Sequence, residues 1–425
     1  MVKKNARRSS AKTTKSLYKK TILDNGIRVV TECLPYVRSV SLGIWADVGS
    51  RDESADRNGI SHFLEHMVFK GTQKRSVRDI AQSLESLGGY LNAFTTKEQT
   101  CYYARVLDVH LPHAMDVLSD LILNATFLPK ELEKEKQVVI EELHNSEDDA
   151  EDIIHDYFEK ALFPGHSLGY PIIGTEANLR SFTREDLRNH VRRHYKPENL
   201  VVAAAGNLDH ETLLRLTEKF FRGMKSEGGR DRIRFSPNGE ARAGLNVYPK
   251  PIQQSHVCLG TVGYGLKHPR RYPLLVLNAL LGEGMSSRLY QAIREKYGLA
   301  YSVYSFVTLL SDAGLFGVYI GTDPKNKSQC IDLVKQELHG LRKRSVPKAE
   351  LERTKSQIKG NLMLGLESMS NRMMRLGSAE MQNEEFAPID SVIKRIDKVS
   401  SEEVLQVAKD LFDVDQFSIV VVQPS

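Results

Sequence analysis

The sequence predicts an α+β fold in which two homologous domains, each an antiparallel sheet layered with helices, close on one another like a clam shell. Three observations lead to this expectation. The chain has 425 residues, more than one domain of about 100–200 residues accommodates. It resembles itself at a constant offset of 217 residues. Each half also has runs of strands followed by runs of helices.

The internal repeat rests on two pairs of matching segments in the same order. The apolar, strand-like run 39–43 resembles 256–260. The helix start 183–187 has a hydroxyl N-cap and an acidic first turn, and it resembles 400–404. Each of these helices leads into a β-branched strand, one in each half. Two matches at one offset indicate a duplication.

The elements of the first half come in groups of one kind. We expect strands near 27–32 and 40–48, a helix over 59–70, a helix over 77–87, strands over 90–95 and 100–107, and long helices from about 113 to 162. Because strands and helices do not alternate strictly, an α+β arrangement is favoured over a parallel α/β sheet.

The domain boundaries follow from composition. Residues 223–244 contain Gly-Gly and Pro-Asn-Gly turns among many charges, which is typical of a solvated linker. We therefore expect a basic, disordered tail over 1–17, a first domain over 18–222, the linker over 223–244 and a homologous second domain over 245–425.

The charge of the chain is unevenly distributed. Residues 1–23 carry eight Lys and Arg and no acid, so the remainder is slightly acidic although the formal net charge is +5. No basic cluster stands out in the remainder, which argues against nucleic-acid binding. The tail lacks the apolar stretch of a secretory signal. It is either a solvated extension or a segment that resembles a mitochondrial transit peptide.

Composition also limits the compartment. Hydrophobic residues make up 41% of the chain, enough to exclude disorder throughout. No run approaches ~18 consecutive apolar residues, so no membrane-spanning helix is expected. The four cysteines lie far apart without a Cys-x-x-Cys pair, which excludes a cysteine zinc cluster and argues against a disulfide framework. A reducing compartment is therefore expected.

The strongest chemical signal is the run His-Phe-Leu-Glu-His at 62–66. Residues four apart share one face of a helix, so His62 and His66 can reach the same metal ion. Glu65 lies on that face, close enough to act on a water molecule. The order His-x-x-Glu-His is that of the inverted zincins. The alternative is a chance triplet on an amphipathic helix.

An acidic helix over 131–143 supplies a candidate third ligand. Glu135 and Glu142 are seven residues apart, which is two helical turns, so their carboxylates line one face. A catalytic zinc ion needs three protein ligands beside water, and a Glu from another helix is chemically expected. A solvated face of Glu and Lys would explain much of the same segment.

Taken together, these motifs resemble the pitrilysin/insulinase family of zinc metallopeptidases, and within it the bacterial members similar to the mitochondrial processing peptidase β-subunit. Glu142 lies 76 positions after His66 and seven positions after Glu135, as in that family. The segments 91–96 and 294–301 match the family as well. The resemblance covers about residues 18–425.

The resemblance implies one Zn²⁺ per chain, held by His62, His66 and Glu142. Glu65 would be the general base, which takes a proton from water and passes it to the leaving amine. Glu135 would be a further catalytic-site residue, an acidic side chain that supports the metal ligands without binding the metal ion itself. The first domain would thus be the zinc-binding catalytic domain.

The second domain would be noncatalytic but would complete the site. At the offset of 217, the metal-site positions fall on Ala279, Gly282, Glu283 and Lys359, which cannot reproduce the constellation. The resemblance implies that Arg294 and Tyr301 stabilise the oxyanion when the shell closes. Isolated residues 1–225 should then bind zinc but cleave peptides very poorly.

The resemblance also implies how substrate binds. A peptide would pair with the strand 90–95 as an added strand, a mode that recognises the backbone. One pocket would favour apolar or aromatic side chains, and two acids would receive a substrate arginine, although a solvated acidic run is the alternative for these acids. The substrate-binding candidates are Phe69, Asn92, Ala93, Phe94, Asp152 and Asp156.

The function expected from these observations is a zinc-dependent endopeptidase that acts on extended oligopeptides or unfolded presequences. One alternative is the catalytic subunit of a hetero-oligomeric processing peptidase. Another is a noncatalytic scaffold of the kind found in respiratory-complex core subunits. The expected partners are a peptide substrate and a second copy of the chain in a homodimer. The resemblance to bacterial members implies a location in the bacterial cytoplasm, with the mitochondrial matrix as the alternative.

Overall fold

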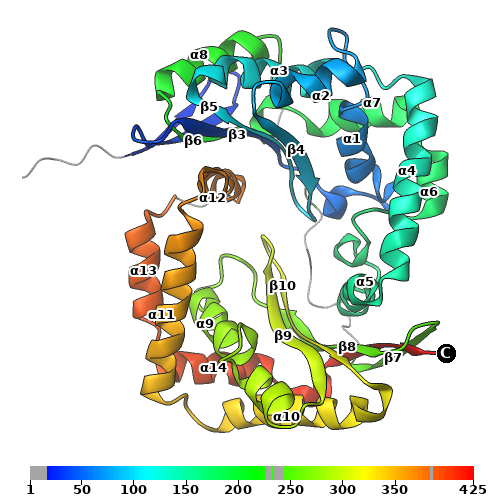
Figure 1. Ribbon diagram of the computed structural model, residues 1–425, viewed down its shortest axis with the longest axis vertical. Helices are drawn as coiled ribbons and strands as arrows, with labels where there is room; N and C mark the ends of the chain where they lie inside the picture. Colours follow the sequence, from blue (N-terminus) through cyan, green and yellow to red (C-terminus); the bar gives the residue numbers. More distant parts are fainter. Residues whose placement is uncertain (1–16, 226–231, 233–234, 236–242, 383–385) are drawn as a thin grey trace, which may run out of the picture.

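The computed structural model describes residues 17–225, 232, 235, 243–382 and 386–425 (Figure 1). All but the last residue of the expected basic tail, and most of the expected linker over 223–244, lie outside these residues. Within the described part of the chain, no helix is long and apolar enough to cross a membrane.

A six-stranded sheet forms the first half, with the strand order β1-β2-β6-β3-β5-β4. Its strands are β1 (Tyr18–Ile22), β2 (Arg28–Cys33), β3 (Ser39–Ala46), β4 (Tyr90–Thr95), β5 (Thr100–Leu107) and β6 (Leu200–Gly206). The helices of this half are α1 (Ile60–Val68), α2 (Val77–Glu85), α3 (Leu111–Asn124), α4 (Pro129–Asp148), α5 (Ala150–Leu162), α6 (Glu176–Ser181), α7 (Arg184–His194) and α8 (His210–Phe221).

A five-stranded sheet forms the second half, with the order β7-β11-β8-β10-β9. Its strands are β7 (Gly244–Lys250), β8 (Ser255–Gly263), β9 (Ala300–Leu309), β10 (Gly314–Thr322) and β11 (Ser418–Pro424). The helices are α9 (Arg271–Gly282), α10 (Lys327–Lys343), α11 (Lys348–Gly365), α12 (Met369–Met381), α13 (Ile389–Asp397) and α14 (Ser401–Leu411), with a π-helical segment at Tyr290–Glu295.

The two sheets confirm the predicted duplication. Strands β2-β6-β3-β5-β4 correspond one by one to β7-β11-β8-β10-β9. The pairs β2–β6 and β7–β11 are parallel, and the other corresponding pairs are antiparallel. The expectation of purely antiparallel sheets was therefore wrong for one strand pair in each half. The predicted helix starts are also equivalent. Thr183 caps α7 by accepting from the Asp186 amide, and Ser400 caps α14 by accepting from the Glu403 amide.

The long helices expected from about 113 to 162 are α3, α4 and α5. The chain breaks after α3 at Ala125 and again between α4 and α5 at Asp149. The Asp149 side chain accepts from the backbone amides of Glu151 and Asp152, which caps α5. An Asp within a run of helix-forming residues acts here as an N-cap and starts a new helix.

Each half lends one helix to the sheet of the other half. Helix α12, from the second half, packs on β2, β3 and β6 of the first sheet, and α5, from the first half, packs on β8 and β11 of the second (Figure 1). Met373 and Leu376 of α12 share a buried cluster with Trp45. Ile154 and Phe158 of α5 belong to a buried cluster that holds the second sheet. The exchange joins the halves through apolar cores.

Two glycines at the repeat offset permit this close packing. A Cβ on Gly43 of β3 would lie 2.6 Å from the sulfur of Met373 in α12. A Cβ on Gly260 of β8 would lie 3.0 Å from the Phe158 ring in α5 and 2.0 Å from the carbonyl oxygen of Phe316. Because glycine has no side chain at these two positions, the exchanged helix can approach the sheet closely.

A buried ion-pair network forms a second connection between the halves. Arg51 is fully buried and lies 2.6 Å from Glu98 and 2.7 Å from Asp312, which sits in the turn between β9 and β10. Arg232, within the expected solvated linker, pairs with Asp47 and Asp52 at 3.1 and 3.2 Å. Movement of the β9–β10 turn away from the first half would separate Arg51 from Asp312 and leave a buried charge uncompensated. The network therefore restrains this turn against the first half.

Candidate metal centre

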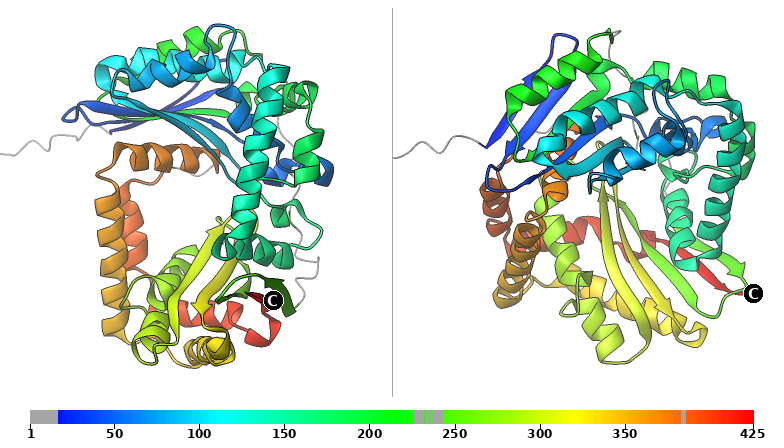
Figure 2. Two further views of the ribbon diagram at one scale, coloured as in Figure 1. Left: turned by 45° about the vertical axis from the view of Figure 1, so that its right-hand side comes forward. Right: turned by 45° about the horizontal axis from the view of Figure 1, so that its top comes forward.

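Helix α1 presents three candidate residues on one face: His62, Glu65 and His66. All three side chains are partly exposed, whereas the opposite face of α1 is buried in the core of the first half. This division is what the apolar residues between the histidines predicted. The helix is thus fixed by packing on one side, and His62 and Glu65 on its other side line a cavity to which both halves contribute residues. Figure 2 shows the two halves facing each other from two further directions.

The start of α1 is held by a carboxylate that sequence analysis missed. Glu53 is only 3% exposed, and it accepts from the amides of Gly59 at 2.7 Å and Ser61 at 2.8 Å. Gly59 has φ 98°, and a Cβ there would lie 2.6 Å from the carbonyl oxygen of Ile173. Nothing in the sequence distinguishes Glu53 from the neighbouring loop acids, because its role depends on the fold.

Helix α4 brings Glu142 to the two histidines. Glu142 Oε1 lies 3.7 Å from His62 Nε2, and Glu142 Oε2 lies 3.4 Å from His66 Nε2. The three ligand atoms all lie within 4.8 Å of one another. Among the described residues, this is the one group of three His, Cys, Asp or Glu side chains so arranged.

This donor set fits a zinc ion. Two imidazoles and one carboxylate are the ligands of many catalytic zinc sites, and they leave one position for water. Burial and the neighbouring His66 lower the pKa of His62 to about 4, so its ring is neutral, as a metal ligand must be. The Glu142 side chain is 48% exposed, which keeps the site open on the side of the cavity.

A second layer of side chains orients His66. Its Nδ1 lies 2.9 Å from Glu135 Oε1, while the other Glu135 oxygen lies 2.7 Å from Lys70 Nζ. Burial alone would raise the pKa of Glu135, but the hydrogen bonds from His66 and Lys70 outweigh it and lower the pKa. Glu135 therefore stays ionised and fixes the His66 ring with Nε2 towards Glu142. The sequence indicated Glu135 but not Lys70.

We expect Glu135→Gln to weaken zinc binding by about 10–100-fold, because the His66 ring loses its charged hydrogen-bond partner. Zinc affinity, measured by competition with a chromophoric chelator, tests this. Glu133→Gln is the matched control, since Glu133 lies on the same helix and contacts Lys136 instead. Equal affinities of the Glu135→Gln variant and the wild type would contradict the role of Glu135.

Glu65 does not take part in the ligand group and is held by the neighbouring sheet. Its Oε2 accepts a hydrogen bond of 2.5 Å from the Thr95 hydroxyl at the end of β4. Burial raises the pKa of Glu65, and the Thr95 hydrogen bond partly opposes that effect. A carboxylate with a raised pKa is a better proton acceptor. The sequence placed Thr95 on the strand but not its contact with Glu65.

A cavity of about 1020 Å³ opens beside these residues. It is lined from the first half by His62, Glu65 and Glu142 and by parts of β4, α4 and α5. The second half contributes Thr308, Leu309 and Leu310 at the end of β9, and Ser378 and Gln382 from α12 and the residue after it. These five residues carry no sequence signal, because only the tertiary contacts between the two halves bring them here.

Four of the six expected substrate-binding residues line this cavity: Ala93, Phe94, Asp152 and Asp156. Burial raises the pKa of Asp156 to about 6. The other two are elsewhere. Phe69 ends α1 and packs against the core of the first half, and the exposed Asn92 donates to the Tyr90 hydroxyl at 2.6 Å. Neither of these two lines the cavity.

Arg294 and Tyr301 lie together but outside the cavity lining. Arg294 Nη1 donates to the Tyr301 carbonyl at 2.8 Å, and its guanidinium lies 5.0 Å from the ring centres of both Tyr290 and Tyr301. The Tyr301 side chain is 74% exposed. In this arrangement the pair is solvated and does not touch the metal-ligand group.

Comparison with known proteins places this geometry in a family. The insulinase (peptidase family M16) model matches residues 28–176, and the model described as peptidase M16 inactive domain matches 181–358. The chain belongs to the insulinase family of peptidases, M16. The predicted pitrilysin-family membership is thereby confirmed, as is the two-domain α+β fold.

Relatives of this M16 chain extend over nearly its whole length. An uncharacterized zinc protease of Bacillus subtilis is 42% identical over 412 residues, which is 96% of this chain and 99% of that protein. An uncharacterized zinc protease of Streptomyces coelicolor is 40% identical over 398 residues, which is 92% of this chain and 87% of that protein. A protease from Helicobacter pylori has the same fold, with a TM-score of 0.89, 24% identity, and coverage of 96% and 99%.

Proposed function

We propose that this M16 chain is a zinc-dependent endopeptidase that hydrolyses peptide bonds in extended oligopeptides or unfolded presequences. The observation that carries the proposal is the group formed by His62, His66 and Glu142, with Glu65 beside it and in none of the ligand positions. A scaffold protein would have no need for such a donor set next to an open cavity.

Each residue of the group would perform a distinct task. The zinc ion would supply a Lewis acid and lower the pKa of water towards ~7. Glu65 accepts a proton from a water molecule in the cavity and returns it to the leaving amine. Thr95 orients the Glu65 carboxylate through their hydrogen bond. Ala93 and Phe94 of the edge strand β4 provide backbone groups with which an extended peptide can pair.

The direct test of the proposal is metal content with activity. We expect one zinc ion per chain by mass spectrometry, and cleavage of a quenched fluorescent peptide that is lost with a chelator and restored by zinc. The acidic residues Asp152 and Asp156 predict better cleavage of peptides with an arginine near the scissile bond. Purified protein that binds zinc yet cleaves no peptide in a diverse library would contradict the proposal.

Arg294 and Tyr301 enter the proposal as residues that approach the cavity when the two halves move together. Their side chains could then donate to the oxyanion, a contribution worth ~10²–10³ in turnover. We expect Tyr301→Phe to lose that much in kcat with unchanged zinc content and a similar KM. Tyr297→Phe serves as control, because Tyr297 is another exposed tyrosine, four residues earlier. A Tyr301→Phe variant with wild-type kcat would remove Tyr301 from the site.

Assembly and location are part of the proposal as well. A homodimer and a bacterial cytoplasmic location are proposed from the resemblance to processing-peptidase-like members. Light scattering on the purified chain tests the dimer. Peptidase activity of that chain without an added protein tests the alternative in which a different noncatalytic chain is required.

A further inference from the structure

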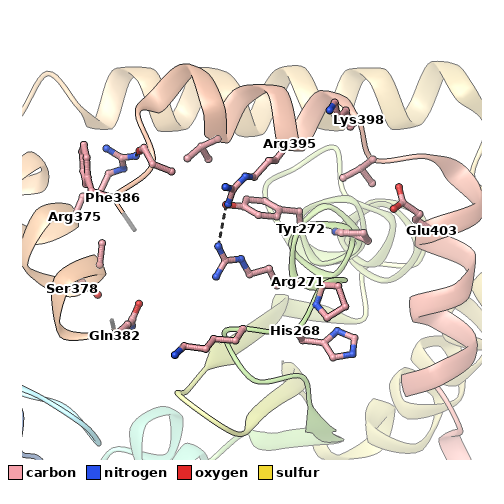
Figure 3. Close-up of a pocket in the computed structure, with 17 residues that line it drawn as sticks. His268, Arg271, Tyr272, Arg375, Ser378, Gln382, Phe386, Arg395, Lys398 and Glu403 are labelled. Carbon is pink, nitrogen blue, oxygen red and sulfur yellow. Dashed lines mark hydrogen bonds between the residues drawn. The ribbon is translucent and has the colours of Figure 1, made fainter. Parts of the chain in front are cut away.

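The second half contains a cavity of about 860 Å³ apart from the metal-ligand group. It lies between α12, α13, the first turn of α9 and the loop before α9 (Figure 3). Five Lys and Arg side chains line it: Lys267, Arg271, Arg375, Arg395 and Lys398. Among its described lining residues, Glu403 is the one carboxylate. That carboxylate already accepts from the Ser400 amide at 2.9 Å.

Aromatic rings hold the guanidinium groups in this cavity. Arg271 and Arg395 donate to the Tyr272 hydroxyl at 3.4 and 3.3 Å from two sides of the residue. Arg375 comes from α12 on the other side of the cavity, 4.5 Å from the Phe386 ring centre. Within the described chain, Arg375, Arg395 and Lys398 form no ion pair with a carboxylate. The Phe386 and Tyr272 rings orient Arg375 and Arg395 without neutralising them, so the charge of these two guanidinium groups remains available to an anion.

The cationic cavity adjoins the cavity of the metal centre. Ser378 and Gln382 line both cavities, so the end of α12 is the boundary between them. The metal-centre cavity is acidic, since its lining includes Asp149, Asp152 and Asp156 in addition to the metal-ligand carboxylate. A ligand that extends past α12 therefore passes from acidic to basic surroundings. Such a ligand needs to be long and to carry a negative group at the far end.

We propose that the cationic cavity binds carboxylate groups of the same peptide whose bond lies at the metal centre. Either the C-terminal carboxylate or Asp and Glu side chains of the peptide supply this group. Guanidinium groups bind carboxylates through paired charge-assisted hydrogen bonds, which gives the site direction as well as attraction. The inference rests on the proposed peptidase function, because it assigns a further subsite to the same substrate.

A binding experiment on the full chain tests the inference without turnover. The Glu65→Gln variant is titrated into fluorescein-labelled 20-residue peptides, and anisotropy gives the affinity. Three peptides share one neutral sequence: one has a free C-terminal carboxylate, one has a C-terminal amide, and one is an amide with two Glu near its end. We expect the two anionic peptides to bind about ten-fold more tightly than the neutral amide.

Charge removal in the cavity locates the effect. We expect Arg395→Gln with Lys398→Gln, added to the Glu65→Gln chain, to abolish the preference for the anionic peptides and to leave affinity for the neutral amide unchanged. Lys394→Gln is the matched control, because Lys394 is exposed on the same helix α13 and does not line the cavity. If only the peptide with the free C-terminus binds more tightly than the neutral amide, the C-terminal carboxylate is the group recognised. If only the peptide with two Glu does so, the side-chain carboxylates are recognised.

The outcomes separate this inference from the proposed function. Equal affinity for the three peptides, or an equal effect of Lys394→Gln and the double change, would overturn the inference. Zinc-dependent cleavage that ignores peptide carboxylates would overturn it too and would leave the proposed function intact. Carboxylate-dependent binding by a chain that shows no cleavage would support the inference and contradict the peptidase.

Discussion

Replacing Glu65 with Gln is expected to reduce peptide hydrolysis to background while one zinc ion stays bound. The amide has the size of the carboxylate and can still accept from Thr95, so the cavity keeps its shape. It cannot accept a proton from water, and general-base catalysis contributes ~10²–10⁴ in rate. Single-turnover cleavage of a quenched peptide, with zinc measured on the same sample, gives both quantities.

Thr95→Val provides the control for this result. That variant keeps the Glu65 carboxylate but removes the hydroxyl that orients it, so we expect a smaller loss of kcat than for Glu65→Gln. Wild-type hydrolysis by Glu65→Gln would show that another group accepts the proton. Loss of zinc from Glu65→Gln would show that Glu65 supports the ligands.

Separating the two halves is expected to abolish stable folding of each. The sequence suggests an independent first domain, in which residues 1–225 bind zinc alone, but the exchange of α5 and α12 changes that expectation. Without α12, the sheet face that contains Trp45 loses the cover of Met373 and Leu376. The apolar face of α5, including Phe158, loses the second sheet at the same time. Large exposed apolar patches lead to association or aggregation.

The experiment compares residues 1–225 alone with residues 1–225 co-expressed with 243–425. We expect aggregation or binding of a hydrophobic dye in the first case and a zinc-binding complex in the second. A full chain cut at an engineered protease site between residues 236 and 242 is the control, since it retains both exchanged helices. A soluble, cooperatively unfolding, zinc-binding fragment 1–225 would contradict the expectation.

Much of the architecture could be predicted from local patterns. The repeat at offset 217 identified the two halves, and the N-caps Thr183 and Ser400 marked equivalent helices. The spacing of seven residues predicted that Glu135 and Glu142 share one helix face. The order His-x-x-Glu-His predicted the same for the polar side chains of another helix. These features were readable because helical periodicity and capping depend on residues only a few positions apart.

The sequence by itself determined the two-domain α+β plan, the duplication and the identity of the side chains that could hold zinc. Only the tertiary structure decided which groups surround the site. Thr95 contacts Glu65, Lys70 contacts Glu135, Glu53 binds the start of α1, and α12 lines the cavity. It also placed Arg294 and Tyr301 beside each other rather than in the cavity lining. The reason is physical: local patterns fix which face of an element is polar, whereas contacts between distant elements depend on how apolar faces pack, and here two of those faces are buried in the opposite half.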